Sequence, residues 1–187
     1  KGSDDDVLTL ASGVPSWASA TAGGKIVQMT YTRSTDLVSW THGSAGVADE
    51  LTTTNRVTIT PTSTSNELIL EAFVPLTGGG TTSIYNFMFY NVTDGALFNP
   101  STEAIGSRGT WGYGIGGHRG PHQDTNDQNI LYLRQIGPCP STSATTFAIY
   151  GRGQSGSPFY INHDSGGDST WGFIGQTLFT ATEVDIA

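Results

Sequence analysis

Hydrophobic and polar residues alternate along much of the chain with a period of two, the pattern of a strand with one buried face. In residues 56–61, for example, Val57 and Ile59 alternate with polar residues until Pro61 ends the segment. No stretch has the spacing of an amphipathic helix. The segments with strand character are residues 25–32, 56–61, 67–76, 83–92, 129–136, 145–153, 157–162 and 171–184. About eight short antiparallel strands predict an all-β fold, an antiparallel β-sandwich of jelly-roll type.

Residues 83–92 carry apolar side chains on both faces of the expected strand. Tyr85, Phe87 and Phe89 form one face, and the other consists of Ile84, Asn86, Met88 and Tyr90. Only one face of a sandwich strand packs in the core, so the second face needs cover from another chain. We therefore expect Tyr85, Phe87 and Phe89 to lie in a subunit interface, in preference to a sugar-binding platform.

Residues 1–24 differ from the rest of the chain, because small and acidic residues surround a single large side chain, Trp17. This composition predicts a joint or linker, followed by one domain over residues 25–187. The chain begins with Lys and not Met, and we expect it to be a fragment or processed product that lacks an upstream part.

Composition narrows the function classes. Of 187 residues only 13% are charged, 36% are hydrophobic and the formal net charge is −8. An acidic chain is unsuited to the nucleic-acid backbone, and no apolar run is long enough to insert into a membrane. The lone Cys139 excludes an intrachain disulfide and a cysteine zinc cluster.

A long Gly-rich segment, residues 106–129, interrupts the strand pattern. Loops of this length in compact domains are usually functional, and this one combines rigid aromatic rings with short polar groups, as binding hot spots do. A second, shorter loop covers residues 164–172. The predicted receptor-binding residues are Trp111, Tyr113, His118, Arg119, His122, Asp124, Asn126 and Asp127, with Asp168 and Trp171 from the shorter loop. The alternative is that Trp111 fills a gap at a trimer axis and the two histidines line it.

Two patterns in this region could suggest a metal. His118 and His122 are four apart, but Gly120 and Pro121 exclude the helix that would place both on one face. The oxygen donors in "DTNDQN" (124–129) lack the rest of a calcium-binding loop. We predict neither a metal site nor a cofactor.

The segment "GQSGSP" (153–158) resembles the nucleophile loop of chymotrypsin-like serine proteases. That alternative would use Ser155 as the nucleophile, His42 as the base and Asp94 to orient the base. The same segment is also an ordinary hairpin, with a Gly/Ser turn between two strands. We favour the hairpin and predict no catalytic residue.

Several segments together resemble the C-terminal head of tailed-bacteriophage tail fibre proteins. The resemblance starts with "VLTLASGVPSW" (7–17) and covers most of residues 7–186, except roughly 93–128. Its further segments are "GKIVQMTYT" (24–32), "VTITPTSTSNELIL" (57–70), "STSATTFAIYGRG" (141–153), "FYIN" (159–162) and "LFTATEVDI" (178–186).

The resemblance implies a non-enzymatic virion protein, a homotrimeric head at the tip of a tail fibre. Such a head would be made in the host cytoplasm and would adhere to a bacterial cell-surface glycan or protein receptor. Its other partners would be the upstream fibre stalk and other virion tail proteins. Trp17 would then pack near the threefold axis. The alternatives are a capsid or baseplate decoration protein, the protease, or a depolymerase using acids such as Glu103, Asp124 and Asp127.

Overall fold

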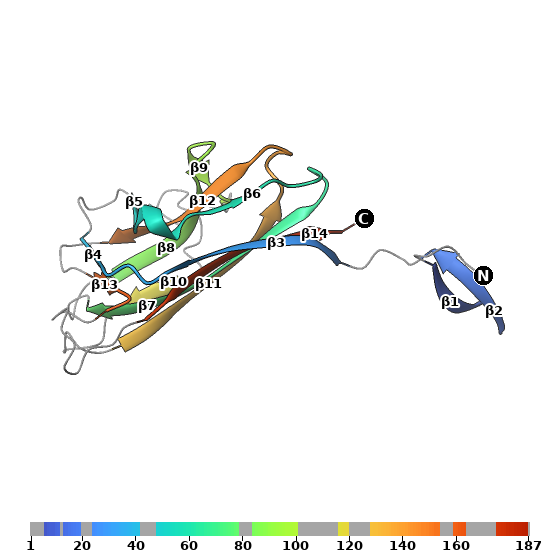
Figure 1. Ribbon diagram of the computed structural model, residues 1–187, viewed down its shortest axis with the longest axis horizontal. Helices are drawn as coiled ribbons and strands as arrows, with labels where there is room; N and C mark the ends of the chain where they lie inside the picture. The colour runs from blue at the N-terminus through green and yellow to red at the C-terminus, as the bar shows by residue number, and fades with distance from the viewer. Residues whose placement is uncertain are drawn as a thin grey trace, which may run out of the picture.

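The computed structural model describes residues 6–11, 13–19, 24–41, 48–78, 84–100, 116–119, 128–153, 159–163 and 175–186. These residues form antiparallel strands and one short 3-10 helix, η1 (Thr53–Asn55), with no α-helix among them. Figure 1 shows two layers of strands that face each other. The prediction of an all-β protein built from antiparallel sheets in a sandwich-like arrangement is confirmed.

The first layer, called here the β7 sheet, contains six strands. They are β3 (Lys25–Ser34), β4 (Val38–Trp40), β7 (Glu67–Gly78), β11 (Gln128–Pro138), β13 (Phe159–Ile161) and β14 (Thr177–Asp185). The long strand β7 pairs with β11 on one side and with β13 and β14 on the other. Strands β4 and β3 continue the sheet beyond β13 and β14, respectively.

The second layer, the β8 sheet, also contains six strands. They are β5 (Asp49–Glu50), β6 (Val57–Ile59), β8 (Ile84–Asn91), β9 (Ala96–Leu97), β10 (Gly116–Arg119) and β12 (Thr145–Gly153). Strands β8 and β12 pair at the centre; β9 and β10 flank β8, and β5 and β6 flank β12. The chain alternates between the sheets: β3–β4, then β5–β6, β7, β8–β10, β11, β12 and finally β13–β14.

The sheets contain more strands than the eight or so that the pattern predicts, because several expected strands are each divided into two shorter ones. Strands β13 and β14 follow each other along the same side of β7, since Ile161 is opposite Leu76 and Leu178 is opposite Phe73. In the same way, β3 and β4 follow each other along β14 and β13. Strands β5 and β6 follow each other along β12, and β9 and β10 along β8. Short edge segments such as β5 and β9 are too brief to give an alternating pattern of their own.

The core lies between the sheets and follows from the period of two. On β7 the even-numbered residues Leu68, Leu70, Ala72, Val74 and Leu76 are buried, and on β12 Phe147 and Ile149 face them. Aromatic rings bridge the layers, with Phe89 stacked on Phe179 at 5.1 Å between centroids. Burial of such rings is the main stabilising contribution that the sequence pattern predicts.

The leader contains regular structure that the composition did not predict. Strands β1 (Asp6–Ala11) and β2 (Val14–Ser19) form an antiparallel hairpin in which Leu8 is opposite Trp17. Gly13 in the turn has φ 81°, a conformation that glycine adopts without strain. Residues 6–11 thus pair with residues 14–19 within the segment predicted as a joint or linker.

Candidate functional site

The sandwich has two different ends, and the strand register defines them. At one end, here called the far end, lie the strand termini Trp40, Gly78, Ile84, Arg119, Gln128, Gly153 and Phe159. These termini meet because Phe159 is opposite both Trp40 and Gly78, Tyr85 is opposite Gly153, and Ile84 is opposite Arg119. The connections 41–48, 78–84, 119–128 and 153–159 therefore all start and finish at the far end.

The opposite end, the terminal end, holds the first and last strand residues of the domain. Asp185 at the end of β14 pairs with Lys25 at the start of β3. In Figure 1 the C-terminus and the start of β3 lie at this end, away from β4, β10 and β13. Its connections are short turns, including residues 60–66 between β6 and β7.

A buried carboxylate holds the turn 60–66 in place. Glu183 is fully buried, and its Oε1 accepts hydrogen bonds from the backbone N–H of Thr62 at 2.8 Å and the side-chain amide of Asn66 at 2.7 Å. Oε2 accepts a hydrogen bond from Gln28 at 2.6 Å. Burial alone would raise the pKa of Glu183, but hydrogen bonds from Gln28, Thr62 and Asn66 outweigh burial and lower the pKa to about 2. The terminal end is thus fixed by an ionised side chain.

Most of the predicted receptor-binding residues lie outside the described part of the chain. These are Trp111, Tyr113, His122, Asp124, Asn126, Asp127, Asp168 and Trp171. His118 and Arg119 lie on β10, where their backbones pair with Tyr85 and Ile84 of β8, and their side chains are not described. Strand β10 ends at the far end, and the residues that follow it, 120–127, lie outside the described ranges.

The second predicted loop has a well-defined base. Asn162, just before it, is fully buried, and the backbone N–H of Gly175 donates to its carbonyl at 2.9 Å. The Asn162 side-chain amide donates to the carbonyls of Ser34 and Asp36 at 3.1 and 3.0 Å, and its Oδ1 accepts from Thr177 at 3.0 Å. Asn162 and Gly175, the described residues on either side of this loop, are therefore held together, so β13 and β14 stay aligned along β7.

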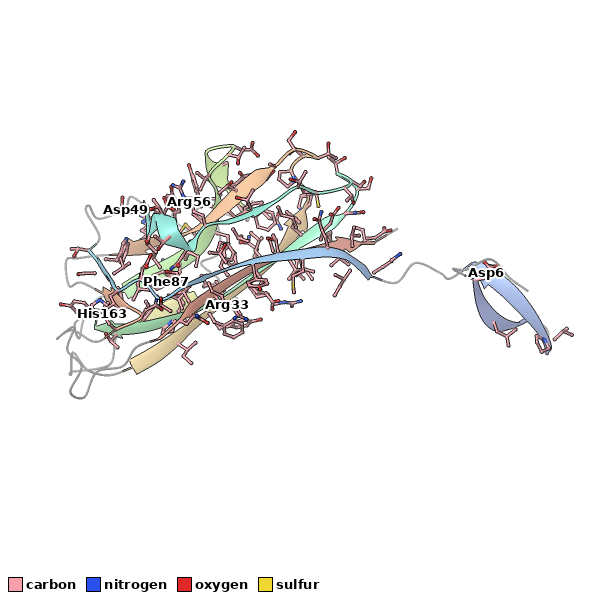
Figure 2. All side chains as sticks on the ribbon, viewed as in Figure 1. Asp6, Arg33, Asp49, Arg56, Phe87 and His163 are labelled. Atoms are coloured by element: carbon pink, nitrogen blue, oxygen red, sulfur yellow. The ribbon has the colours of Figure 1, made fainter. Side chains whose placement is uncertain are left out.

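Aromatic packing supports the far end from within. The ring centroids of Trp40 and Phe159 are 6.2 Å apart, and those of Phe87 and Phe159 are 6.0 Å apart. Figure 2 shows Phe87 between the two layers and His163 near the far end. A Cβ on Gly151 would lie 2.8 Å from Cη2 of Trp40, so this strand position needs glycine. The strand ends at the far end therefore sit on a packed aromatic core.

Two of the residues predicted for the subunit interface are corrected by the structure. Phe87 and Phe89 are fully buried between the sheets of a single chain, so neither ring has surface left for a partner. The prediction assigned the wrong face because both faces of β8 are apolar: Met88, on the outer face, is also buried. The side chains of Trp17 and Tyr85 lie outside the described ones.

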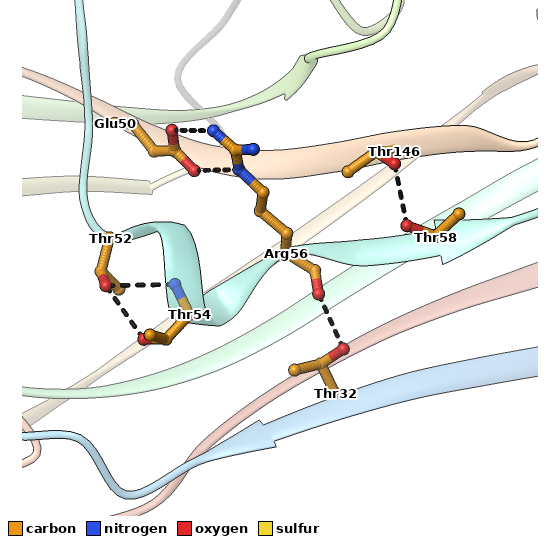
Figure 3. Close-up of polar contacts among 7 residues, drawn as sticks. All are labelled: Thr32, Glu50, Thr52, Thr54, Arg56, Thr58 and Thr146. Carbon is orange, nitrogen blue, oxygen red and sulfur yellow. Dashed lines mark hydrogen bonds and ion pairs between the residues drawn. The ribbon is translucent and has the colours of Figure 1, made fainter.

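The outer face of the β8 sheet carries a polar and aromatic cluster that the sequence did not reveal. Tyr90 and Tyr150 stack with centroids 4.2 Å apart. Beside Tyr150, Arg56 donates two hydrogen bonds to Glu50 at 2.7 and 2.8 Å (Figure 3). Burial, and then the charge of Glu50, raise the pKa of Tyr150. The cluster depends on pairing between β5, β8 and β12, a long-range relationship that no local pattern encodes.

The protease alternative does not fit the strand register. Asp94 accepts a hydrogen bond from Asn91 at 2.7 Å in the turn after β8, where Asn91 is opposite Phe147 of β12. Gly153 lies at the other end of the same ladder, about 20 Å away at about 3.3 Å per residue. Ser155 follows Gly153 by two positions, so Asp94 is too distant to orient a base beside it. His42 and Ser155 themselves lie outside the described residues.

The hairpin interpretation of "GQSGSP" is wrong as well. Strand β12 belongs to the β8 sheet, while β13 pairs with β4 and β7 in the other sheet. The segment therefore links two layers. A Gly/Ser turn between two alternating patterns gives no information about which sheet each strand joins, because the alternation is the same in both.

Within the described ranges, no group of three His, Cys, Asp or Glu side chains is arranged to hold a metal ion. The same ranges contain no helix long and apolar enough to cross a membrane. Comparison of the chain with family models and with curated proteins finds no match.

Proposed function

We propose that this chain is the receptor-binding head of a trimeric phage tail fibre, which acts by adhesion to the bacterial surface. The proposal starts from the resemblance of residues 7–17 and of the later strands to such heads. The all-β sandwich arrangement is compatible with it.

The observation that carries the proposal is that the leader and the predicted binding loop attach to opposite ends of the sandwich. The leader joins the domain at Lys25, at the terminal end, beside the turn that Glu183 holds. The connection that contains His122, Asp124, Asn126 and Asp127 begins and finishes at the opposite end. A head mounted on a stalk needs this polarity, because its binding loops must point away from the attachment.

The strand order supports a jelly-roll assignment. The lines β3–β4, β13–β14, β7 and β11 are adjacent in one sheet, and β5–β6, β12, β8 and β9–β10 are adjacent in the other. Apart from β8 and β9–β10, which are neighbours in one sheet, successive lines cross between the layers, as they do in jelly rolls. In this fold the loops at one end can vary while the two sheets keep their packing.

Adhesion requires a rigid base under the variable loops. Trp40, Phe87 and Phe159 fill the core beneath the far end, and Asn162 closes the base of the 164–174 loop. Loops on such a base lose less conformational freedom when they bind, which favours affinity. The proposed receptor is a cell-surface glycan or protein, and the proposed location is the tip of the virion tail fibre.

Binding of the fluorescently labelled chain to a panel of bacterial strains tests the proposal. We expect binding to some strains, with its loss in Trp111→Ala and Arg119→Ala at unchanged thermal stability. Lys25→Ala, which removes an exposed cation at the terminal end, is the control and should bind normally. Absence of binding to every strain would favour a decoration role, and a fall in the viscosity of capsular polysaccharide would favour a depolymerase.

A further inference from the structure

The outer face of the β7 sheet is unusually apolar for a surface exposed to water. Its register places side chains in rows across β11, β7, β14 and β3. One row contains Tyr132, Phe73, Leu178 and Arg33, and the next contains Arg134, Glu71, Thr180 and Tyr31. The inward residues of β7 and β11 are buried in the core, so these rows are the opposite face of the same strands.

Large apolar side chains dominate this face. Their exposed fractions range from 39% for Ile136 to 71% for Ile130. The exposed members of the patch, here called the β7 patch, are Met29, Tyr31, Phe73, Ile130, Tyr132 and Ile136. With side-chain areas of about 150–250 Å² for aromatics, together they expose on the order of 600 Å², crossed by the polar row of Arg134, Glu71 and Thr180.

Two of the charged groups on the face, Glu71 and Arg134, are paired within it, and Arg33 stacks on an aromatic ring. Glu71 accepts a hydrogen bond from the hydroxyl of Tyr132 at 2.7 Å and forms an ion pair with Arg134 at 3.3 Å. The guanidinium of Arg33 lies over the ring of Tyr31 at 5.2 Å. Figure 2 marks Arg33 on this sheet. Burial of the Glu71–Arg134 pair costs less than burial of a lone charge, which favours covering the centre of the face.

From this face we infer that the β7 patch packs against a second copy of the same chain. A standard protein interface buries about 800 Å² per partner, and the patch with its polar rim approaches that area. Its composition also fits, because Tyr, Phe, Met and Arg are the residue types enriched in such interfaces.

The composition argues against a glycan on this face. Sugar platforms use aromatic rings among hydrogen-bonding groups, whereas Met29, Ile130 and Ile136 offer only aliphatic surface. The ring pair Phe73–Tyr132, with centroids 4.7 Å apart at 34°, is tilted and does not form one flat platform.

The position of the leader favours a copy of this chain over an unrelated protein. The leader enters the domain at Lys25, the first residue of β3, and β3 carries Met29 and Tyr31 of the patch. Copies joined upstream would hold these strands at high effective concentration, which promotes their association. In this respect the inference rests on the proposed fibre head, and it names the surface through which heads assemble. In this proposal the β7 patch takes the place of Phe87 and Phe89 as the apolar surface between subunits.

The first test measures the molar mass of wild type and of β7-patch variants by light scattering. Wild-type chain at micromolar concentration should be oligomeric, and Met29→Glu and Ile130→Glu should each give monomers that retain the strand signal in circular dichroism. Leu37→Glu, at a similarly exposed apolar residue between β3 and β4, should leave the oligomer intact. A monomeric wild type, or variants that keep the wild-type mass, would overturn the inference.

Methionine oxidation provides a second test that needs no variant. The chain has two methionines: Met29 in the patch is 61% exposed in the single chain, and Met88 is 3% exposed. Hydrogen peroxide converts each thioether to a sulfoxide and is itself reduced to water. If a second copy covers the patch, Met29 should be oxidised about as slowly as Met88, and both should be oxidised equally fast in urea. Rapid oxidation of Met29 in the concentrated native protein contradicts the inference.

The two proposals fail separately. Assembly through the β7 patch without binding to any bacterial strain would refute the adhesion function and leave the interface standing. Binding to cells by a protein whose Met29 is freely oxidised would refute the interface and leave adhesion standing.

Discussion

The carboxylate of Glu183 on β14 accepts a hydrogen bond from the side-chain amide of Asn66 at 2.7 Å, across the base of the sandwich. This contact links the last strand to the turn before β7, residues far apart in the sequence. The same carboxylate accepts hydrogen bonds from the backbone N–H groups of Thr62 and Ser63, so one ionised group binds several donors of this turn.

Glu183 should make the stability of the domain depend on pH. Its pKa is about 2 in the folded chain and about 4.3 in an unfolded one. A depressed pKa contributes stability above the unfolded value, and this contribution, about 3 kcal/mol, is lost as pH falls from about 5 towards 2. Urea unfolding measured across this range should show the loss in the wild type.

Glu183→Gln should remove most of this pH dependence and cost about 2–3 kcal/mol at pH 7, because the charge-assisted hydrogen bonds are lost. Glu67→Gln is the matched control, since Glu67 lies on the neighbouring strand outside this network. An unchanged acid profile in Glu183→Gln would show that the network contributes little.

Asn162 combines a strained backbone with buried hydrogen bonds, and two substitutions separate these contributions. Its φ is 64°, and its side chain makes three hydrogen bonds, to Ser34, Asp36 and Thr177. Asn162→Gly should lower the free energy of unfolding by about 3 kcal/mol through the lost bonds. Asn162→Ala should lower it by about 1–2 kcal/mol more, because alanine is unfavourable at positive φ.

Chemical denaturation of both variants gives the comparison. Equal losses in the two would mean that backbone conformation is not a constraint at Asn162. A loss below about 1 kcal/mol in both would contradict the role of Asn162 as the closure of the 164–174 loop.

Gly151→Ala should destabilise the far end. The new Cβ would lie 2.8 Å from Trp40 and 3.1 Å from Leu51, so the indole must move. Overpacking of this kind costs about 1–3 kcal/mol, or a fall in Tm of about 2–4 °C for each kcal/mol. Ser39→Ala, at an exposed position of β4, is the control and should change stability by less than about 0.5 kcal/mol.

The sequence was informative where one face of a strand is buried. Residues 145–153 and 67–76 were predicted as strands from their β-forming apolar residues, and they became β12 and most of β7. It was uninformative about pairing. Whether β13 pairs with β12 or β7, and whether Phe87 faces the core or a partner, depends on contacts between distant segments. The β7 patch was missed for the same reason, since Met29, Phe73 and Tyr132 become neighbours only when β3, β7 and β11 join one sheet.

The leader hairpin and Glu183 show two further reasons why local patterns were insufficient. Val14, Pro15 and Trp17 lack strict alternation, yet β2 pairs with β1 through backbone groups. A Glu at an inward position of β14 looks unfavourable until the donors of the turn 60–66 surround it.

The last prediction locates receptor binding by blocking each end of the sandwich in turn. Ser143, exposed between β11 and β12, lies at the terminal end, and His122 belongs to the connection that leaves the far end. A polyethylene-glycol maleimide attached to His122→Cys should abolish binding to cells, whereas the same group on Ser143→Cys should leave binding intact. The native thiol does not interfere: Cys139 is buried, and burial, with the nearby charges of Glu183 and Glu67, raises its pKa to about 11. The opposite result, with binding blocked only from Ser143→Cys, would place the receptor at the terminal end and overturn the proposed orientation of the head.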